Sequence, residues 1–297
     1  MQEVTSDNIA TTPAHVNMSL TQPALRQFRS RIAVTPLEKR IEAYERVQEL
    51  LSRNKSTYAV VHTISKQFGV SQSTVYAWTK GRSPLGRRCG RIAYTKELFY
   101  VIGSILGDGS IYFWKNGYTI WLLGEREFCL KYARIIPSCT SSRSATAYPY
   151  RGRNVWFVKF HNAELYFLIR QIRKDLGILS NLLKRGNISV NRVNLIEGFF
   201  DAEGCVKVIK ERVRRTPKIC LDFSNTDANL LDLIQKALKC ALGIEATLTS
   251  QKDKRPNRKM MYHLRIYSKD GVRKFFQHLS TTKNNSEKAR HVENWLR

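Results

Sequence analysis

The sequence contains an internal repeat, and this repeat limits the possible folds more than any other feature. The first copy begins with VIGSILGDG at 101–109, which aligns with IEGFFDAEG at 196–204. Further along, it contains WFVKFHNAELYFL at 156–168, which aligns with YHLRIYSKDGVRKFF at 262–276. Each copy has the order helix, two strands, helix, two strands, helix. Two such copies predict an α+β domain with a pseudo-two-fold axis.

Hydrophobic periodicity and turn residues predict the elements of each copy. The expected helices are 98–106, 127–136 and 164–176 in the first copy and 194–202, 228–242 and 271–279 in the second. The expected strands are 111–115, 118–123 and 155–160, then 205–213, 218–223 and 262–267, with less regular strands near 144–150 and 244–250. Asn116 and Gly117, between the first two strands, are typical of a hairpin turn.

Small residues recur four positions apart in the first helix of each copy. They are Gly103 and Gly107 in the first copy and Gly198 and Ala202 in the second. Residues at this spacing lie on one face of a helix, where small side chains let two backbones approach closely. We therefore expect the two helices to form a close interface at these four residues.

An acid followed by glycine ends each of these helices: Asp108 and Gly109, then Glu203 and Gly204. Glycine suits the end of a helix, but an acid there adds to the negative partial charge of the helix C-terminus. A divalent cation would compensate this charge, because carboxylates and unpaired carbonyl groups are the oxygen ligands that magnesium prefers. If the helices pack closely, Asp108 and Glu203 meet at one end of the interface. Two unrelated surface acids in turns are the alternative.

The two motifs resemble the signature helices of the LAGLIDADG homing endonuclease family. The resemblance runs from Thr95 to the C-terminus and is typical of single-chain members with one motif in each half. It implies the duplicated αββαββα core of that family, with curved antiparallel sheets that bind double-stranded DNA. It also implies cleavage of both strands at a long asymmetric target to leave 3′ overhangs, as in intron homing, by a monomer.

The resemblance also assigns the metal ligands. In the family, the second acid of each motif binds the catalytic metal, and here these acids are Asp108 and Glu203. The carbonyl groups of Gly107 and Ala202 are further candidate ligands. Two or three Mg²⁺ ions are expected, and Mn²⁺ is expected to substitute. The first motif lacks the earlier acid, since Leu106 stands where the second motif has Asp201, but that position is not a metal ligand in the family.

Lysines near the metals would stabilise the charge that develops during phosphodiester hydrolysis. The candidate catalytic lysines are Lys207, Lys184 and Lys288. For each of them, a simple phosphate contact or a solvated charge is an equally good interpretation.

The charge balance favours a polyanionic partner. The chain has 50 Lys and Arg against 24 Asp and Glu, a formal net charge of +26. Such a field favours nucleic acid, and basic and aromatic residues on the predicted hairpins would form the DNA-binding face. The candidates are Tyr112, Trp114, Arg151, Arg153 and Lys159 in the first half, and Lys210, Arg212, Arg214, Arg215, Lys218, Lys252, Lys254, Arg255, Arg258, Lys259 and Arg265 in the second.

A second nucleic-acid signal precedes the repeat. The pattern of apolar residues in 57–81 resembles a helix-turn-helix, in which Ile64, Phe68, Val70, Val75 and Trp78 would form the core. The residues that would face DNA are Gln72, Ser73, Thr74, Tyr76 and Lys80. A plain helical hairpin is the alternative.

The expected organisation has four parts. A mobile tail covers 1–35, a small all-α helix-turn-helix module 36–81, a basic linker 82–94 and the endonuclease core 95–297, with repeats of about 95–190 and 191–297.

Several classes of protein are excluded or left open. No apolar run is long enough to span a membrane, and residues 1–30 lack the pattern of a signal peptide. The sequence therefore predicts a location in the cytoplasm, at a prokaryotic nucleoid, or in an organelle, with no membrane and no small-molecule substrate. A non-cleaving DNA-binding regulator and an RNA maturase on the same fold remain the alternatives to an endonuclease.

Overall fold

The computed structural model describes residues 37–82, 84, 91–114, 117–141, 145–151, 154–209, 218–252, 259–285 and 287–296. The chain divides into two compact units, Met1–Pro84 and Leu85–Arg297. The predicted tail and most of the predicted linker lie outside the described residues.

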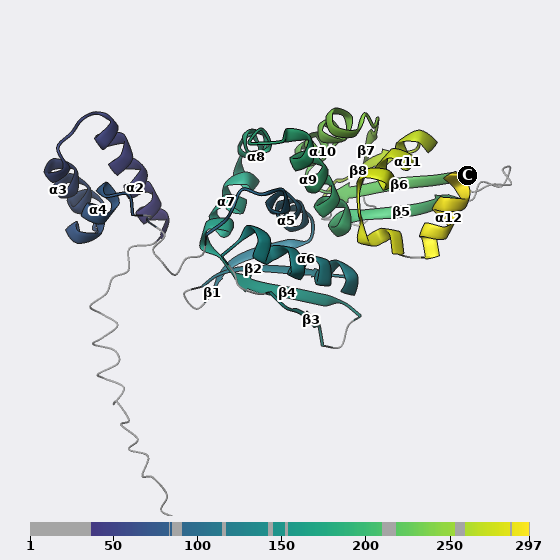
Figure 1. Cartoon of the computed structure of the whole chain (residues 1–297), viewed down its shortest axis with the longest axis horizontal. Helices are drawn as coiled ribbons and strands as arrows, with labels where there is room; N and C mark the ends of the chain where they lie inside the picture. Colours follow the sequence, from purple (N-terminus) through teal and green to yellow (C-terminus); the bar gives the residue numbers. More distant parts are fainter. Residues whose placement is uncertain are drawn as a thin grey trace, which may run out of the picture. The chain divides into compact units, whose positions relative to one another are not determined.

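The helices in the described part of the smaller unit are α2 (Leu37–Ser52), α3 (Thr57–Phe68) and α4 (Gln72–Thr79) (Figure 1). The hydroxyl groups of Ser56 and Ser71 accept hydrogen bonds from the first turns of α3 and α4, and so satisfy backbone donors that the helices leave unpaired. Gly69 ends α3 in the left-handed conformation, at φ 66°. The buried core of the unit consists of Ala43, Val47, Val60, Ile64, Val70, Val75 and Trp78.

The first half of the larger unit runs from α5 to α8. Its elements are α5 (Lys96–Gly107), β1 (Gly109–Trp114), β2 (Gly117–Gly124), α6 (Arg126–Cys139), β3 (Ala147–Pro149), β4 (Trp156–His161), α7 (Ala163–Lys174) and α8 (Leu176–Leu183). The strands form one antiparallel sheet in the order β1-β2-β4-β3.

The second half repeats this order. Its elements are α9 (Ile188–Glu203), β5 (Gly204–Ile209), β6 (Lys218–Asn225), α10 (Ala228–Leu242), β7 (Thr247–Gln251), β8 (Met261–Ile266) and α11 (Lys269–His278), followed by the 3₁₀ helix η1 (Thr282–Asn285) and α12 (Glu287–Leu296). The second antiparallel sheet has the matching order β5-β6-β8-β7. The predicted fold class, a duplicated αββαββα unit, is therefore confirmed.

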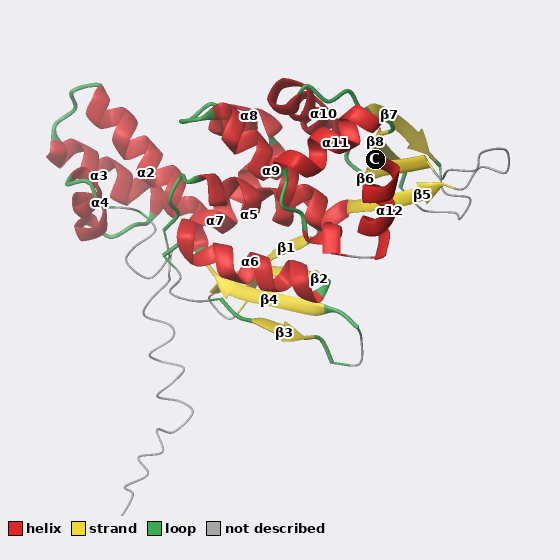
Figure 2. Cartoon of the chain, turned by 45° about the vertical axis from the view of Figure 1, so that its right-hand side comes forward, coloured by secondary structure: helices red, strands yellow, loops and turns green. Residues whose placement is uncertain are grey.

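Helices α5 and α9 pack against each other between the two sheets (Figures 1 and 2). Their backbones touch at the predicted small residues. A methyl group added at Gly103 would come within 2.9 Å of the backbone nitrogen of Phe199, and one added at Gly198 would lie 2.8 Å from the carbonyl carbon of Tyr100. No larger side chain fits at these positions unless the helices separate.

Each sheet has one face on the core and one face away from it. In the first sheet, α6 and α7 cover the face that carries Ile120, Leu122 and Val158, all fully buried. In the second sheet, α10 and α11 cover the face that carries Leu221 and Leu264. Alternation along the strands places the neighbouring residues on the opposite face, which we call the open face of each sheet.

Three differences from the sequence-based expectation concern helices. Helix α9 begins at Ile188, six residues before the predicted start, because the side chain of Asn187 caps it. Helices α8 and α12 were not expected. Among the described residues, no helix is long and apolar enough to cross a membrane.

Candidate active site

The two motif acids lie at neighbouring helix ends. Asp108 follows directly after α5, and Glu203 is the last residue of α9. The helices touch here as well, since a methyl group added at Gly107 would lie 2.6 Å from the Cβ of Ala202 and 2.9 Å from the Cγ of Glu203. The duplicated fold thus brings together two carboxylates that are 95 residues apart in the sequence.

The surroundings favour the neutral forms of both acids. Burial raises the pKa of Asp108 to about 6, although part of its side chain remains accessible to solvent. Burial, and then the nearby charge of Asp108, raise the pKa of Glu203 to about 7. A hydrogen bond of 3.2 Å from Asn225 Nδ2 to Glu203 Oε1 acts in the opposite direction. Burial, and for Glu203 also the repulsion by Asp108, therefore outweigh the contacts that favour the ionised forms.

This donor set fits a divalent cation. A cation between the carboxylates would remove their repulsion, and Mg²⁺ is typically held by one or two carboxylates together with water and substrate phosphates. Within the described part of the chain, no cluster of three or more His, Cys, Asp or Glu residues could hold a metal by itself. The remaining ligands would have to come from the backbone, water or the substrate. The carbonyl groups of Gly107 and Ala202 directly precede the acids and stay predictions.

Lys283 is a functional candidate that the sequence analysis missed. It lies in η1, and its ammonium group is close enough to Asp108 to lower the pKa of that carboxyl. Its Nζ is also 3.2 Å from Glu125 Oε1, just before α6. Because Lys283 and Asp108 are far apart in sequence and meet only in the fold, no local motif could have indicated the pair.

The three predicted lysines have different positions. Lys207, on the open face of the second sheet, forms an ion pair with Asp222. Lys184 precedes α9, whereas Glu203 is the last residue of that 16-residue helix. At about 1.5 Å per residue, the helix is about 24 Å long. The structure therefore does not bring Lys184 to the acids. Lys288 is in α12, and its side chain lies outside the described residues.

A pocket of about 630 Å³ opens beside Glu203. Arg173 lines it and donates hydrogen bonds to the carbonyl oxygens of Ile105 (3.1 Å) and Gly109 (2.8 Å), so that its positive charge lies at the C-terminal end of α5. Asn225 and Lys259 line the pocket as well. Arg173 and Glu203 thus line the same pocket, and Arg173 is bonded to the end of the helix that precedes Asp108.

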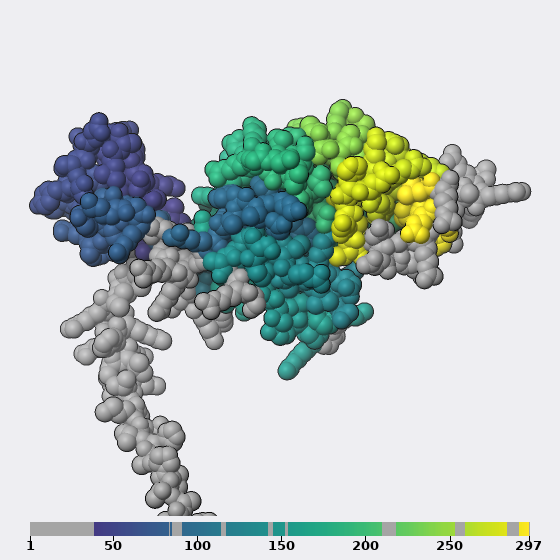
Figure 3. All heavy atoms as spheres, in the orientation of Figure 1, coloured from purple at the N-terminus to yellow at the C-terminus, as the bar shows by residue number. Residues whose placement is uncertain are grey.

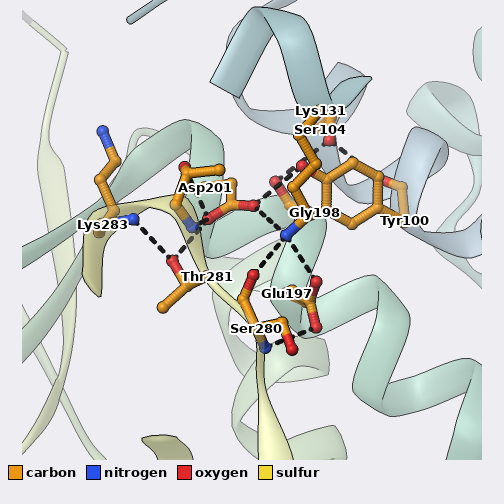
Figure 4. A network of polar contacts seen from close by, with 10 residues as sticks. Tyr100, Ser104, Lys131, Glu197, Gly198, Asp201, Ser280, Thr281 and Lys283 are labelled. Carbon is orange, nitrogen blue, oxygen red and sulfur yellow. Dashed lines mark hydrogen bonds and ion pairs between the residues drawn. The ribbon is translucent and has the colours of Figure 1, made fainter. Parts of the chain in front are cut away.

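Asp201, two residues before Glu203, is fully buried and fully hydrogen-bonded (Figure 4). Its Oδ2 accepts from the hydroxyl of Tyr100 at 2.9 Å and from Lys131 Nζ at 2.8 Å. Its Oδ1 accepts from the Thr281 hydroxyl at 2.5 Å and from the Thr282 backbone N–H at 2.8 Å. The structure thus gives this acid a role in holding the segment before Lys283, rather than a place beside the other two carboxylates.

The open faces of the two sheets have different chemistry at equivalent positions. The register matches, since Gly109 pairs with Leu122 in one sheet and Gly204 with Phe223 in the other. The matched residues are Tyr112 and Lys207, Trp121 and Asp222, and Lys159 and Arg265. The first face is thus largely aromatic, whereas the second carries charges.

Asp222 is the centre of the charged face. Its carboxylate is fully buried, because Lys207 and Arg265 cover it, with Arg265 Nε at 3.1 Å and His263 Nδ1 at 3.2 Å. The predicted DNA-contact residue Arg265 and the predicted catalytic residue Lys207 are therefore already paired.

The other predicted DNA contacts are only partly described. Lys159, Arg151, Lys252 and Lys259 are exposed, and Tyr112, Lys218 and Arg265 are partly exposed. In the smaller unit, Gln72, Ser73, Tyr76 and Lys80 are exposed, and Thr74 is partly exposed. The side chains of Trp114, Arg153, Lys210, Arg212, Arg214, Arg215, Lys254, Arg255 and Arg258 lie outside the described residues.

A comparison with protein families tests the resemblance to the LAGLIDADG family. Residues 190–280, which run from α9 to the end of α11, match the family described as LAGLIDADG-like domain. This part of the chain is therefore similar to a LAGLIDADG-like domain. The resemblance to the LAGLIDADG family is thereby confirmed.

The chain is also similar to two uncharacterized proteins of Methanocaldococcus jannaschii. One is 25% identical over 170 residues, which cover 54% of this chain and 60% of the relative. The other is 24% identical over 229 residues, which cover 71% of this chain and 77% of the relative. The match to the first relative thus spans less than two thirds of its length.

Solved structures similar to this chain include the homing endonuclease I-DmoI and a further protein. The homing endonuclease I-DmoI in complex with DNA and Mn is 18% identical, with a TM-score of 0.44 over 64% of this chain and 99% of that one. Structures of I-DmoI with DNA and Mg or Ca are similar to the same degree, each with a TM-score of 0.44. The N-terminal LAGLIDADG domain of DUF199/WhiA is 13% identical, with a TM-score of 0.46 over 70% of this chain and 91% of that one.

Proposed function

We propose that this LAGLIDADG protein is a site-specific, metal-dependent endonuclease that cuts both strands of DNA. The observation that carries the proposal is the meeting of Asp108 and Glu203 at the ends of α5 and α9, with pKa values raised to about 6 and about 7. Structural ion pairs normally lower carboxyl pKa values, whereas a pair of acids whose pKa values are raised by burial and mutual repulsion is a candidate for a site that binds a cation.

Asp108 and Glu203 would hold the divalent cations, with the carbonyl groups of Gly107 and Ala202 as further candidates. When bound, Mg²⁺ supplies an activated water and stabilises negative charge on the phosphate and the leaving oxygen. Mn²⁺ should substitute for it, because carboxylate, carbonyl and water ligands suit both ions.

Other residues of the chain would orient the metal-binding carboxylates and neutralise negative charge on the phosphate. Asn225 donates to Glu203 Oε1 and so directs the other carboxylate oxygen away from that bond. Lys283 places a positive charge near Asp108, where it can stabilise the developing charge on a phosphate. Arg173, which is bonded to the end of α5, would supply positive charge to the pocket that it shares with Glu203.

The two sheets and the smaller unit would bind the duplex. The net charge of +26 supports electrostatic attraction to phosphates, and exposed Lys159 and partly exposed Lys218 lie on the open faces. In the smaller unit, the exposed side of α4 with Gln72, Ser73 and Tyr76 has the composition of a recognition helix. We propose a monomer that contacts a long asymmetric target and leaves 3′ overhangs.

One observation favours a second candidate function, the binding of RNA by a maturase. On the open face of the first sheet, Trp121 lies 6.3 Å from Tyr112 and 6.0 Å from Phe157, measured between ring centroids. Tyr148, 51% exposed, extends this group of rings. Aromatic side chains on a sheet can stack on unpaired bases.

The test uses the DNA that flanks this gene, joined without the intervening insertion. Purified protein is incubated with this DNA and Mg²⁺, and the products are sized under native and denaturing conditions. We expect one discrete double-strand cut with 3′ overhangs. Specific binding without any cut would support a regulator, and tight binding to the precursor transcript without a cut in the DNA would support a maturase.

A further inference from the structure

We infer that Asp201 is a positioning residue that delivers Lys283 to the Asp108 side of the site. This inference rests on the proposed endonuclease function and deepens it. Asp201 stands at a position where the first motif has Leu106, so the duplication itself does not require an acid there.

Asp201 is fully buried, so its charge must be compensated by the groups around it. A carboxylate with no solvent exposure is destabilising unless hydrogen bonds and a counter-charge satisfy it. Here both oxygens are satisfied. Tyr100 of α5 and Lys131 of α6, both from the first half, bind Oδ2, whereas Thr281 and Thr282 bind Oδ1.

Asp201 therefore ties the C-terminal segment to both halves. We call Ser280, Thr281 and Thr282 the latch segment. Lys131 also donates to the Ser280 carbonyl oxygen at 2.7 Å, and Glu197 accepts from the Ser280 N–H at 3.1 Å (Figure 4). The space-filling view shows the yellow C-terminal part directly against the teal surface of the first half (Figure 3).

Lys283 follows the latch segment immediately. Its backbone N–H donates to the Thr281 hydroxyl at 3.2 Å, and that hydroxyl is itself bound to Asp201. The path from Asp201 to the lysine that lies near Asp108 thus contains one residue and two hydrogen bonds. If the latch opens, Lys283 loses the backbone anchor that sets its place.

The first half has apolar residues at the positions that correspond to Asp201 and the latch segment. Leu106 occupies the position equivalent to Asp201, and it lines the same pocket as Leu176, which follows α7 as Ser280 follows α11. We therefore expect only one of the two acids to receive a lysine in this way, and we expect the effect of the latch to be confined to one strand of the target.

The test is a strand-resolved cleavage assay with Lys283→Met, Asp201→Leu and the double variant, on full-length protein with Mg²⁺. Each strand carries its own end label. We expect each single variant to slow the cut of the same strand by about 10- to 100-fold and to leave nicked product, with a change in Kd for the target of less than about threefold. We expect the double variant to be no slower than Lys283→Met alone, because both changes remove one function.

Two further variants keep the test decisive. Asp201→Asn preserves the shape of the side chain, and its melting temperature and cutting are compared if Asp201→Leu folds poorly. Val190→Leu, at an exposed position near the start of α9, is the control and should leave the rate of both cuts unchanged. An Asp201 variant that slows both strands equally, or a double variant whose losses multiply, would overturn the positioning role.

Amide exchange at Thr282 separates failure of this inference from failure of the proposed function. We expect Asp201→Leu to raise exchange at Thr282 well above that of wild type. A wild-type protein that cuts no DNA would reject the endonuclease proposal and with it the catalytic role of the latch. A cutting wild type whose Thr282 exchange is unchanged by Asp201→Leu would reject the latch alone.

Discussion

Gly107 packs on Ala202 so closely that an added methyl group would lie 2.6 Å from the alanine Cβ. Each of these residues directly precedes a motif acid. The contact therefore sets the separation of Asp108 and Glu203, and any larger side chain in the interface acts on the site as well as on stability. The packing of α5 on α9 therefore also brings the two acids together.

We expect substitution in this interface to destabilise the protein. Gly198→Ala places a methyl group against the carbonyl group of Tyr100, and overpacking of this kind costs about 1–3 kcal/mol, or more where backbones touch. Thermal denaturation measures the effect. Val190→Leu, at an exposed position of the same helix, is the control and should change the melting temperature little.

Neutral substitution of either acid should nearly abolish cleavage. Asp108→Asn and Glu203→Gln keep the shape of the side chain but remove the anionic ligand. Binding to DNA should persist or tighten slightly, because a negative charge is lost. Rates of cutting and target affinity are measured on the same preparation, and a variant that cuts at the wild-type rate would exclude that acid from the metal site.

The raised pKa values predict an unusual pH dependence of stability. Because burial raises the folded-state pKa of Asp108 to about 6 and that of Glu203 to about 7, the folded state holds more protons than the unfolded state between about pH 4 and pH 7. Without divalent cations, these two groups should therefore make the protein less stable as the pH rises through this range.

The check is a set of melting temperatures at pH 5 and pH 8. The variant with Asp108→Asn and Glu203→Gln together should lose this dependence, and Mg²⁺ should stabilise wild type but not the variant at pH 8. Equal Mg²⁺ effects on both proteins would mean that the cation binds elsewhere.

Substitutions of Lys207 and Lys283 should have different effects on DNA affinity and on the rate of cutting. Lys207 is paired with the buried Asp222, so Lys207→Met should change DNA affinity more than the rate of cutting. Lys283→Met should instead lower the cutting rate at saturating DNA by about 10- to 100-fold. If Lys207→Met lowered the cutting rate more than Lys283→Met, the catalytic lysine would be Lys207.

Removal of the smaller unit should weaken binding more than catalysis. Residues 36–94 carry 11 Lys and Arg against 4 Asp and Glu, whereas both acids and Lys283 lie beyond them. A fragment of residues 92–297 should cut at a similar rate at saturating DNA, with a shallower salt dependence of binding. Its footprint should be shorter on one side only, and an unchanged footprint would contradict DNA binding by α3 and α4.

Much of the fold followed from local pattern. Helix α10 has the predicted bounds, since Asp227 caps it and Gly243 ends it. The repeat also predicted the close packing of α5 on α9, because small residues four apart leave room on one helix face for a second backbone. Local pattern did not predict α12. It also missed the first turns of α9, which are weakly apolar and depend on the cap at Asn187.

The site was predictable only where it lies within a motif. Asp108 and Glu203 were found because each copy of the repeat carries one. Lys283 and Arg173 reach the site through tertiary packing, which no spacing in the sequence encodes. Alternation along β6 places Asp222 on the open face, but the burial of its carboxylate depends on side chains from β5 and β8.

The most direct test of the central claim maps both cut positions on one target DNA with Mg²⁺. Wild type and the variant with Asp108→Asn and Glu203→Gln together are compared at equal DNA occupancy. We predict a single staggered cut by wild type, dependent on a divalent cation, and none by the variant. A variant that binds and still cuts both strands at the same positions would contradict the assignment of the active site.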